Sequence, residues 1–313
     1  MPPAVAARLS RWIGRGTLTP RQVRTGRQCA LELAGLQEPQ PWAALWQQMQ
    51  GVRMAPGGTS VLIEPVSLQA GMNNVSMRAL ASPLTAGQLA TLQELLTPLF
   101  VAVGARLMPG PRGLIAEFQE RLALSCRPLE DCEGVELRDC LPQGPDAGAL
   151  RRLLTECQMV LHQAGERGID LPEEVTGIWA WGEGALPLAE RTEVRLLSAD
   201  PLLAALDRAL NPGEPAISAD PLGPAARGKR TRSLARELIQ GPPRSDVVWH
   251  DLPDLPGLEA LVEGADIALR KGYLDRVTLA WWPEPGHSAH GSTIRRRDLS
   301  AFWRGPAGPW HKP

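Results

Sequence analysis

The sequence predicts an α/β protein with a mostly parallel sheet, and three observations support this fold class. Two long segments place apolar residues at the 3.6-residue spacing of amphipathic helices. Short apolar runs of the kind that form buried strands stand between helical segments. The last third of the chain reads strand, helix, strand over residues 246–250, 258–271 and 276–282, an alternation typical of parallel sheets covered by helices.

The first 57 residues are predicted to form a helical section. Leu9 and Ile13 recur with Arg and other polar residues around them, which is typical of an amphipathic helix. Thr19 followed by Pro20 has the pattern of a second helix start.

Residues 58–172 are predicted to form an α+β section. The unbroken apolar run at 59–65 indicates a buried strand. Thr85 suits the N-cap of an amphipathic helix that ends near Gly104, and a second such helix is expected at 147–163. Further strands are expected at 66–77, with a turn at 71–74, and at 105–108.

Residues 173–305 are predicted to form an α/β core-like section, and residues 306–313 a flexible tail rich in Pro and Gly. The expected strands cover 175–181, 193–197, 246–250 and 276–282, and the expected helices cover 201–210 and 258–271. The basic cluster at 227–232 (RGKRTR) lies in a Pro- and Gly-rich stretch, and we interpret it as a solvated loop.

Composition excludes several classes of protein. The 313 residues carry a formal net charge of −1, so no strong field attracts nucleic acid or an anionic membrane. No apolar run approaches the roughly 20 residues that span a bilayer, and the N-terminus lacks the pattern of a signal peptide. We therefore expect a cytoplasmic protein that binds neither membranes nor nucleic acid.

The five cysteines are Cys29, Cys126, Cys132, Cys140 and Cys157. An odd number without a secretion signal argues against a disulfide framework. No CxxC pair occurs, although close pairs are what structural zinc sites recruit. We interpret these residues as buried or half-buried thiols, and we expect neither a metal nor a cofactor.

Several motifs resemble the archaeal-type cofactor-independent phosphoglycerate mutases. The stretch 85–187 carries segments such as CRPLEDCEG and LRRLLTECQMVLHQ in the order of the middle domain of those enzymes. The most specific segment is IWAWGEG at 178–184, which resembles their Trp-x-Trp-Gly-x-Gly turn. The resemblance implies a partial alkaline-phosphatase-like core with a mostly parallel sheet, plus an α+β domain of the phosphoglycerate mutase middle type.

A closer resemblance, over nearly the whole chain, is to a proteobacterial family of RpfE-type regulatory proteins. The matching segments are PVSLQAG at 65–71, ECQMVLH at 156–162 and DLSAFWR at 298–304. This resemblance implies a regulatory protein on a phosphoglycerate mutase-like scaffold.

The mutases need two divalent metal ions and a Ser or Thr nucleophile, because the ions stabilise phosphate charge during transfer. The resemblance assigns this chemistry to positions that the sequence does not fill. The N-terminal section contains no aspartate, and the first one in the chain is Asp131. Asp254 matches one metal motif, but Leu258 stands where its histidine belongs, and Gly286 stands for an aspartate before His287.

Candidate ligand-binding residues remain at His250, Asp251, Asp254, His287 and His290. The first three stand at the end of a predicted strand, where α/β folds place ligands. Two hypotheses stay open. One is a non-catalytic regulatory or protein-interaction protein without catalytic residues. The alternative is a metal-dependent phosphoryl-transfer enzyme or phosphatase with a rearranged site around Asp251, Asp254, His287 and His290.

Ten tryptophans against one tyrosine are unusual. Trp179 and Trp181 are two apart on a predicted strand and share one of its faces. Trp281 and Trp282 stand at another strand end, and Trp303 lies near the C-terminus. These residues pack in the core or anchor an interface with a protein partner or a second copy of the chain, where Trp is enriched.

Overall fold

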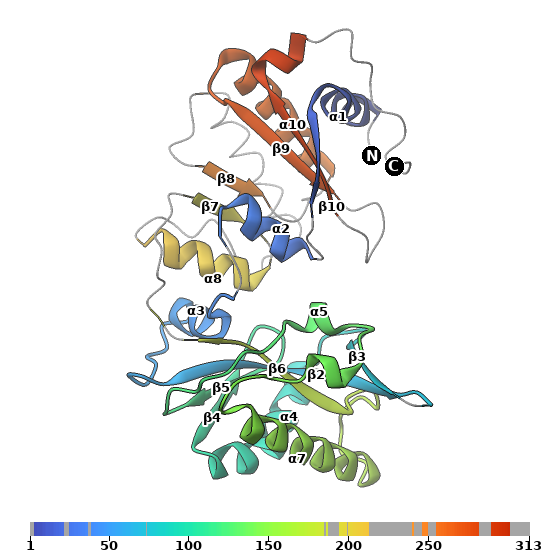
Figure 1. Ribbon diagram of the computed structural model, residues 1–313, viewed down its shortest axis with the longest axis vertical. Helices are drawn as coiled ribbons and strands as arrows, with labels where there is room; N and C mark the ends of the chain where they lie inside the picture. Colours follow the sequence, from blue (N-terminus) through green and yellow to red (C-terminus); the bar gives the residue numbers. More distant parts are fainter. Residues whose placement is uncertain are drawn as a thin grey trace. The chain divides into compact units, whose positions relative to one another are not determined.

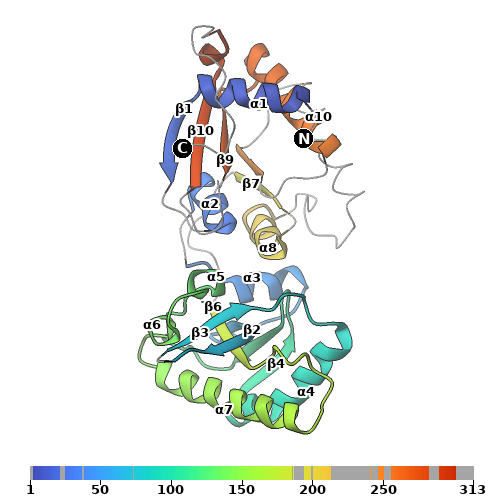
Figure 2. The same cartoon turned by 90° about the vertical axis from the view of Figure 1, so that its right-hand side faces the viewer.

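The computed structural model describes residues 3–21, 25–36, 39–72, 74–184, 186, 194–198, 200–212, 240, 246–249, 255–281 and 289–300. They form two compact units (Figures 1 and 2). The middle unit is Pro39–Arg191, and the terminal unit combines Met1–Glu38 with Thr192–Pro313. This division differs from the expected sections 1–57, 58–172, 173–305 and 306–313, because the strand at 177–184 pairs inside the middle unit.

The middle unit is built on a five-stranded sheet. Its strands are β2 (Thr59–Ala70), β3 (Val75–Ala79), β4 (Ala105–Pro109), β5 (Leu114–Phe118) and β6 (Gly177–Gly184). β2 is the central strand, since it pairs with β3, β5 and β6. Its first eight residues are buried, and burial fades toward Ala70. The buried strand predicted at 59–65 is therefore confirmed.

The prediction of a mostly parallel sheet is wrong, because every described pairing in this sheet is antiparallel. Short links explain the direction. Residues 71–74 join β2 to β3, and residues 110–113 join β4 to β5. Links this short reverse the chain, whereas parallel neighbours need a crossover of a dozen residues or more. The strand β5 was not predicted from the sequence.

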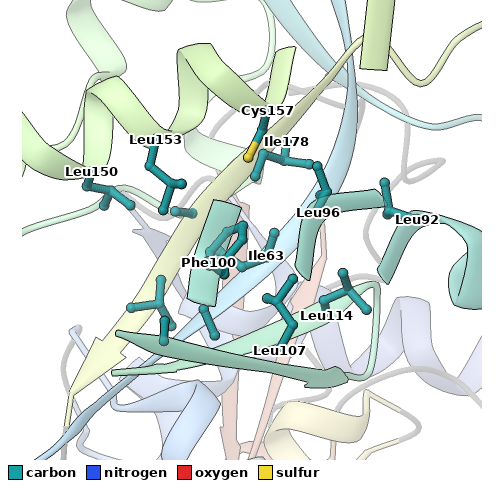
Figure 3. Packing of buried hydrophobic residues seen from close by; sticks show 14 of the residues in the cluster. Ile63, Leu92, Leu96, Phe100, Leu107, Leu114, Leu150, Leu153, Cys157 and Ile178 are labelled. Atoms are coloured by element: carbon teal, nitrogen blue, oxygen red, sulfur yellow. The ribbon is translucent and has the colours of Figure 1, made fainter. Parts of the chain in front are cut away.

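Two helices cover one face of this sheet: α4 (Ala86–Ala102) and α7 (Ala147–Glu166). Thr85 caps α4 through a capping box with Gln88, which confirms the predicted helix start. Figure 3 shows Phe100 of α4 beside Ile63 of β2, with Leu153 and Cys157 of α7 pointing toward the same core. Each fully buried side chain of this size stabilises the fold by about 2 kcal/mol.

The helix α3 (Trp42–Met49) contacts β2 and β6. Gly182 of β6 has φ 68°, and an added Cβ would lie 3.0 Å from the Cβ of Trp42. Glycine is thus required for both the backbone conformation and the close approach. A loop closed by the bridge between Ser125 and Gln143 carries two one-turn helices, α5 (Leu129–Cys132) and α6 (Leu137–Cys140).

The terminal unit contains a three-stranded antiparallel sheet in the order β1 (Thr17–Arg21), β10 (Ala289–Arg295), β9 (Arg276–Trp281). The helices α1 (Pro3–Arg15) and α10 (Leu255–Lys271) supply its described core. The 3-10 helix η1 (Arg296–Ser300) follows β10. The predicted helix start at Thr19 and Pro20 is wrong, because these residues pair with Gly291 and His290 in the sheet.

A second part of the terminal unit holds the parallel pair β7 (Val194–Leu197) and β8 (Asp246–Trp249). The helix α8 (Pro201–Leu210) packs on β7, and α2 (Gly26–Leu33) contacts β8. The prediction of a helix at 201–210 is confirmed. Over the ranges that the structure describes, no helix has both the length and the apolar content needed to cross a bilayer.

Candidate functional site

Four of the five predicted ligand-binding residues, His250, Asp251, Asp254 and His287, lie outside the described residues. Only the backbone of His290 is placed, in β10 opposite Trp281 and Pro20. β8 ends at Trp249, directly before His250, and belongs to the parallel pair rather than to the sheet of β10. The convergence of Asp251, Asp254, His287 and His290 therefore stays a prediction.

The five tryptophans of the predicted interface have different outcomes. Trp179 and Trp181 are 1% and 0% exposed, so the core-packing alternative describes them and an exposed anchor role does not. The indole Nε1 of Trp179 donates to the carbonyl oxygen of Arg127 at 2.9 Å, which ties β6 to the loop 125–143. Trp281 belongs to β9, and Trp282 and Trp303 lie outside the described residues.

Two acidic side chains of the middle unit, Glu117 (buried) and Glu183 (half-buried), hydrogen-bond to backbone N–H groups. Glu117 of β5 accepts from the backbone N–H of Ala55 at 2.8 Å and from Arg106 Nη2 at 2.7 Å. Glu183 accepts from the backbone N–H of Cys126 at 2.8 Å, and burial raises the pKa of this carboxyl. The sequence did not predict this role of Glu183, because the only pattern in the GEG segment is its two glycines, and these say nothing about the partner of the glutamate.

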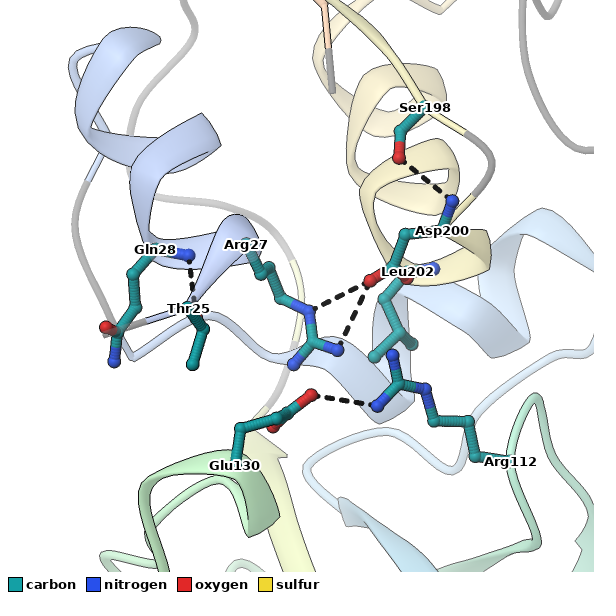
Figure 4. A network of polar contacts seen from close by, with 8 residues as sticks. All are labelled: Thr25, Arg27, Gln28, Arg112, Glu130, Ser198, Asp200 and Leu202. Atoms are coloured by element: carbon teal, nitrogen blue, oxygen red, sulfur yellow. Dashed lines mark hydrogen bonds and ion pairs between the residues drawn. The ribbon is translucent and has the colours of Figure 1, made fainter. Parts of the chain in front are cut away.

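Acidic side chains of the terminal unit act in the same way. Asp207, 1% exposed, accepts from the backbone N–H of Leu196 at 2.8 Å. Asp200 caps α8 by accepting from the N–H of Leu202 at 2.8 Å. It also accepts from Nε and Nη2 of Arg27, each at 3.3 Å (Figure 4). These carboxylates therefore stabilise a helix start and a strand edge.

Figure 4 also draws an ion pair of the middle unit, in which Arg112 Nη1 lies 2.8 Å from Glu130 Oε1. Both side chains are partly exposed, so the pair contributes at most about 1 kcal/mol. It joins the β4–β5 connection to α5 at the surface of the unit.

All five cysteines are free thiols, as the sequence indicated. Cys29, Cys132, Cys140 and Cys157 are buried, and Cys126 is half-buried. Burial, followed by the charge of Glu156, raises the pKa of Cys157 to about 12. Burial also raises the pKa of Cys126 and Cys132. These three thiols are protonated near pH 7 and are poor nucleophiles in the folded protein.

In the part of the chain that the structure describes, no three His, Cys, Asp or Glu side chains lie close enough to share a metal ion. Several carboxylates among the described residues instead accept hydrogen bonds from backbone N–H groups and from arginine. Among the described residues, the large apolar side chain with the greatest exposure is Met72, at the tip of the β2–β3 hairpin. There Met72 is 99% exposed and Val75 is 37% exposed. Figure 1 shows this hairpin reaching out from the body of its unit.

Comparisons with known proteins give distant structural matches. The PH0037 protein from Pyrococcus horikoshii matches 93% of this chain and 80% of its own, with a TM-score of 0.47 and 13% identity. A cofactor-independent phosphoglycerate mutase from Thermoplasma acidophilum matches 93% of this chain and 81% of its own, with a TM-score of 0.37 and 14% identity. No family model and no curated protein matches the sequence. The helices and strands of this chain make it a mixed α/β protein, and it has a distant similarity to these two structures.

Proposed function

We propose that this protein is a non-catalytic regulatory protein that acts through contact with a protein partner, as the resemblance to RpfE-type proteins implies. The observation that carries the proposal is the use of buried acids and thiols as structural groups. Glu117, Asp200 and Asp207 bind backbone N–H groups or arginines. The thiols of Cys126, Cys132 and Cys157 are held protonated.

Phosphoryl transfer makes the opposite demands on such groups. Carboxylate oxygens must face a cavity to hold divalent cations, and a nucleophile must be activated by a base or a metal. The carboxylates in question have their oxygens directed to N–H donors of the fold. Position 258, where the mutase pattern has a ligand histidine, is a leucine in the first turn of α10. These features support a scaffold whose polar groups serve stability.

We assign partner contact to the β2–β3 hairpin. Met72 and Val75 expose apolar surface at its tip, and exposed apolar surface of this kind marks a site of protein contact. Methionine adapts its shape to a partner surface because its side chain is unbranched and polarizable. The proposed partner is a protein whose surface has an apolar depression. Free thiols agree with a reducing compartment, so we place this contact in the cytoplasm.

Metal content and turnover test the proposal against a rearranged phosphoryl-transfer site. Purified protein is analysed for bound metal and is assayed with 3-phosphoglycerate and p-nitrophenyl phosphate in the presence of Mn²⁺, Zn²⁺ or Mg²⁺. We expect far less than one equivalent of metal and no turnover above buffer. The double variant Asp251→Asn/Asp254→Asn is compared with Asp170→Asn, which changes an exposed aspartate of the middle unit. Stoichiometric metal and turnover that only the double variant loses would establish the enzyme alternative.

A further inference from the structure

The loop 125–143 of the middle unit carries three cysteines, Cys126, Cys132 and Cys140. Its ends are joined by backbone hydrogen bonds in both directions between Ser125 and Gln143, each of 2.9 Å. Cys132 ends α5 and Cys140 ends α6, and both one-turn helices contact β3. The loop therefore presents two equivalent turns with a thiol at the end of each.

One arginine holds these two turns together. Arg127 Nη2 donates to the carbonyl oxygen of Asp131 at 3.2 Å, and its Nη1 donates to that of Asp139 at 3.4 Å. Asp131 and Asp139 directly precede the two cysteines, so the guanidinium fixes the backbone beside both thiols. The carbonyl of Arg127 in turn accepts from Trp179, which is itself fixed in β6.

This arrangement brings Cys132 and Cys140 into contact. The side chain of Cys140 interacts with that of Cys132 and helps to raise its pKa, and both residues are 0% exposed. The thiol of Cys126 instead lies beside the carboxylate of Glu183, which accepts from the backbone N–H of Cys126. Cys132 also acts on Cys126, but Cys140 is the thiol that acts on Cys132, so Cys132 and Cys140 form the pair among the three neighbouring thiols.

We propose that Cys132 and Cys140 are a modification site, at which a low-molecular-weight disulfide of the glutathione class converts the pair into an intramolecular disulfide. One cysteine thiolate attacks the external disulfide and forms a mixed disulfide, releasing one external thiol. The second cysteine thiolate then attacks the protein sulfur of that mixed disulfide and releases the second external thiol. The pair loses two electrons and two protons, and the external disulfide gains both.

Burial sets the conditions of this reaction. Since neither thiol is exposed, an external disulfide reaches them only when the loop opens locally. Opening also removes the burial that raises the pKa of Cys132, so a larger fraction of the thiol is ionised in the open loop than in the closed one. The pair therefore stays reduced and unreactive while the loop is closed, and oxidation of the pair shows that the loop has opened. This inference does not depend on the proposed function.

A peptide map identifies the pair. The full-length protein is incubated with excess glutathione disulfide until its thiol count is constant, and remaining thiols are alkylated. Trypsin cuts after Arg121, Arg138 and Arg151 but not between Arg127 and Pro128. Cys126 and Cys132 therefore stay in the peptide 122–138, and Cys140 lies in 139–151. We expect these two peptides to be joined without reductant, and fragmentation of the joined peptides to place the bond at Cys132.

A matched variant distinguishes a disulfide formed by Cys132 from one formed by Cys126. In Cys126→Ser the two peptides should still be joined, because only Cys132 remains to form the link. Oxidation should raise the melting temperature of the wild type and of Cys126→Ser by about 5 °C, since closing a short loop restricts the unfolded chain. Cys140→Ser should show neither the link nor the rise. A bond inside 122–138, a link lost in Cys126→Ser, or five alkylated cysteines after full incubation would overturn the proposal.

Discussion

The two units of this protein differ in how the chain builds them. The middle unit comes from the continuous stretch Pro39–Arg191, and its antiparallel sheet links strands through short connections. The terminal unit joins both ends of the chain. The strand β1, which follows α1 near the N-terminus, pairs with β10 near the C-terminus. Its core packs Trp12 of α1 with Val262 and Leu269 of α10. A continuous unit is specified by local signals, whereas a discontinuous one depends on contacts between remote segments.

This difference bears on function, because the expected ligand-binding residues belong to the unit made from the chain ends. Where that unit is described, its buried acids hold a helix start and a strand edge. The exposed apolar hairpin belongs to the continuous unit. Remote contacts thus stabilise the terminal unit, whereas the contact with a partner that we propose lies on a local element of the middle unit.

The largest expected effect is a loss of stability confined to the middle unit. Phe100→Ala removes a ring that is 0% exposed and leaves a cavity, which should cost about 3–5 kcal/mol. Hydrogen exchange, followed peptide by peptide, should show lost protection in 39–191 alone. Val101→Ala is the control, since Val101 is 61% exposed and its loss should cost less than about 0.5 kcal/mol. Equal loss of protection in both units would show that they unfold as one.

The corresponding change in the terminal unit is Asp207→Ala. It leaves the N–H of Leu196 and the side chain of Asn211 without their carboxylate partner, which should cost about 1–3 kcal/mol. Urea unfolding of the variant, compared with Arg208→Ala on the same helix, measures the difference. If the two variants are equally stable, the carboxylate does not hold β7 to α8.

A thiol should make stability depend on pH. The ordinary pKa of 9.0 for Cys157 is raised to about 12 in the folded protein, so the unfolded chain gives up this proton first as pH rises. Stability is therefore present below pH 9 and is lost between pH 9 and about 12, by about 1.4 kcal/mol per pH unit for this thiol. Urea midpoints at pH 8 and pH 10.5 should fall less for Cys157→Ala than for the wild type. Parallel falls would contradict the shift.

The smallest expected loss of stability comes from removing the N-cap of α4. Thr85→Ala removes the oxygen that accepts from the N–H of Gln88 and should cost about 1 kcal/mol. Thr91→Ala in the same helix is the matched control, and it should be neutral because alanine is the better helix former. Thermal unfolding of both variants gives the comparison. A loss of equal size at both positions would mean that the capping box adds nothing specific.

Local signals allowed much of the middle unit to be predicted. The cap at Thr85 fixed the start of α4, and the apolar run from Thr59 marked β2. Strand direction could not be predicted, because alternating helices and strands do not specify which strands pair. One partner of β2 is β6, although three strands and four helices, two of them single turns, stand between β2 and β6 in the chain.

The terminal unit shows the same limit more strongly. Thr19 and Pro20 have the pattern of a helix start, but pairing with β10 makes them a strand. The candidate site was predicted less well. The pattern placed Trp179 and Trp181 on one face but left open whether that face was exposed, and the structure buries both. The contact of Cys132 with Cys140 depends on Arg127, and no spacing rule connects these three positions.

The central claim, that this protein acts by contact rather than by catalysis, is tested most directly by partner capture with a hairpin variant. Tagged wild type is cross-linked in its native host and compared with Met72→Ser/Val75→Ser and with Met159→Ser, which changes an exposed methionine of α7. Mass spectrometry identifies what each retains, including a second copy of the chain. We predict one partner that is retained by the wild type and Met159→Ser and is lost at least tenfold by the hairpin variant. Identical retention by all three proteins would contradict the account.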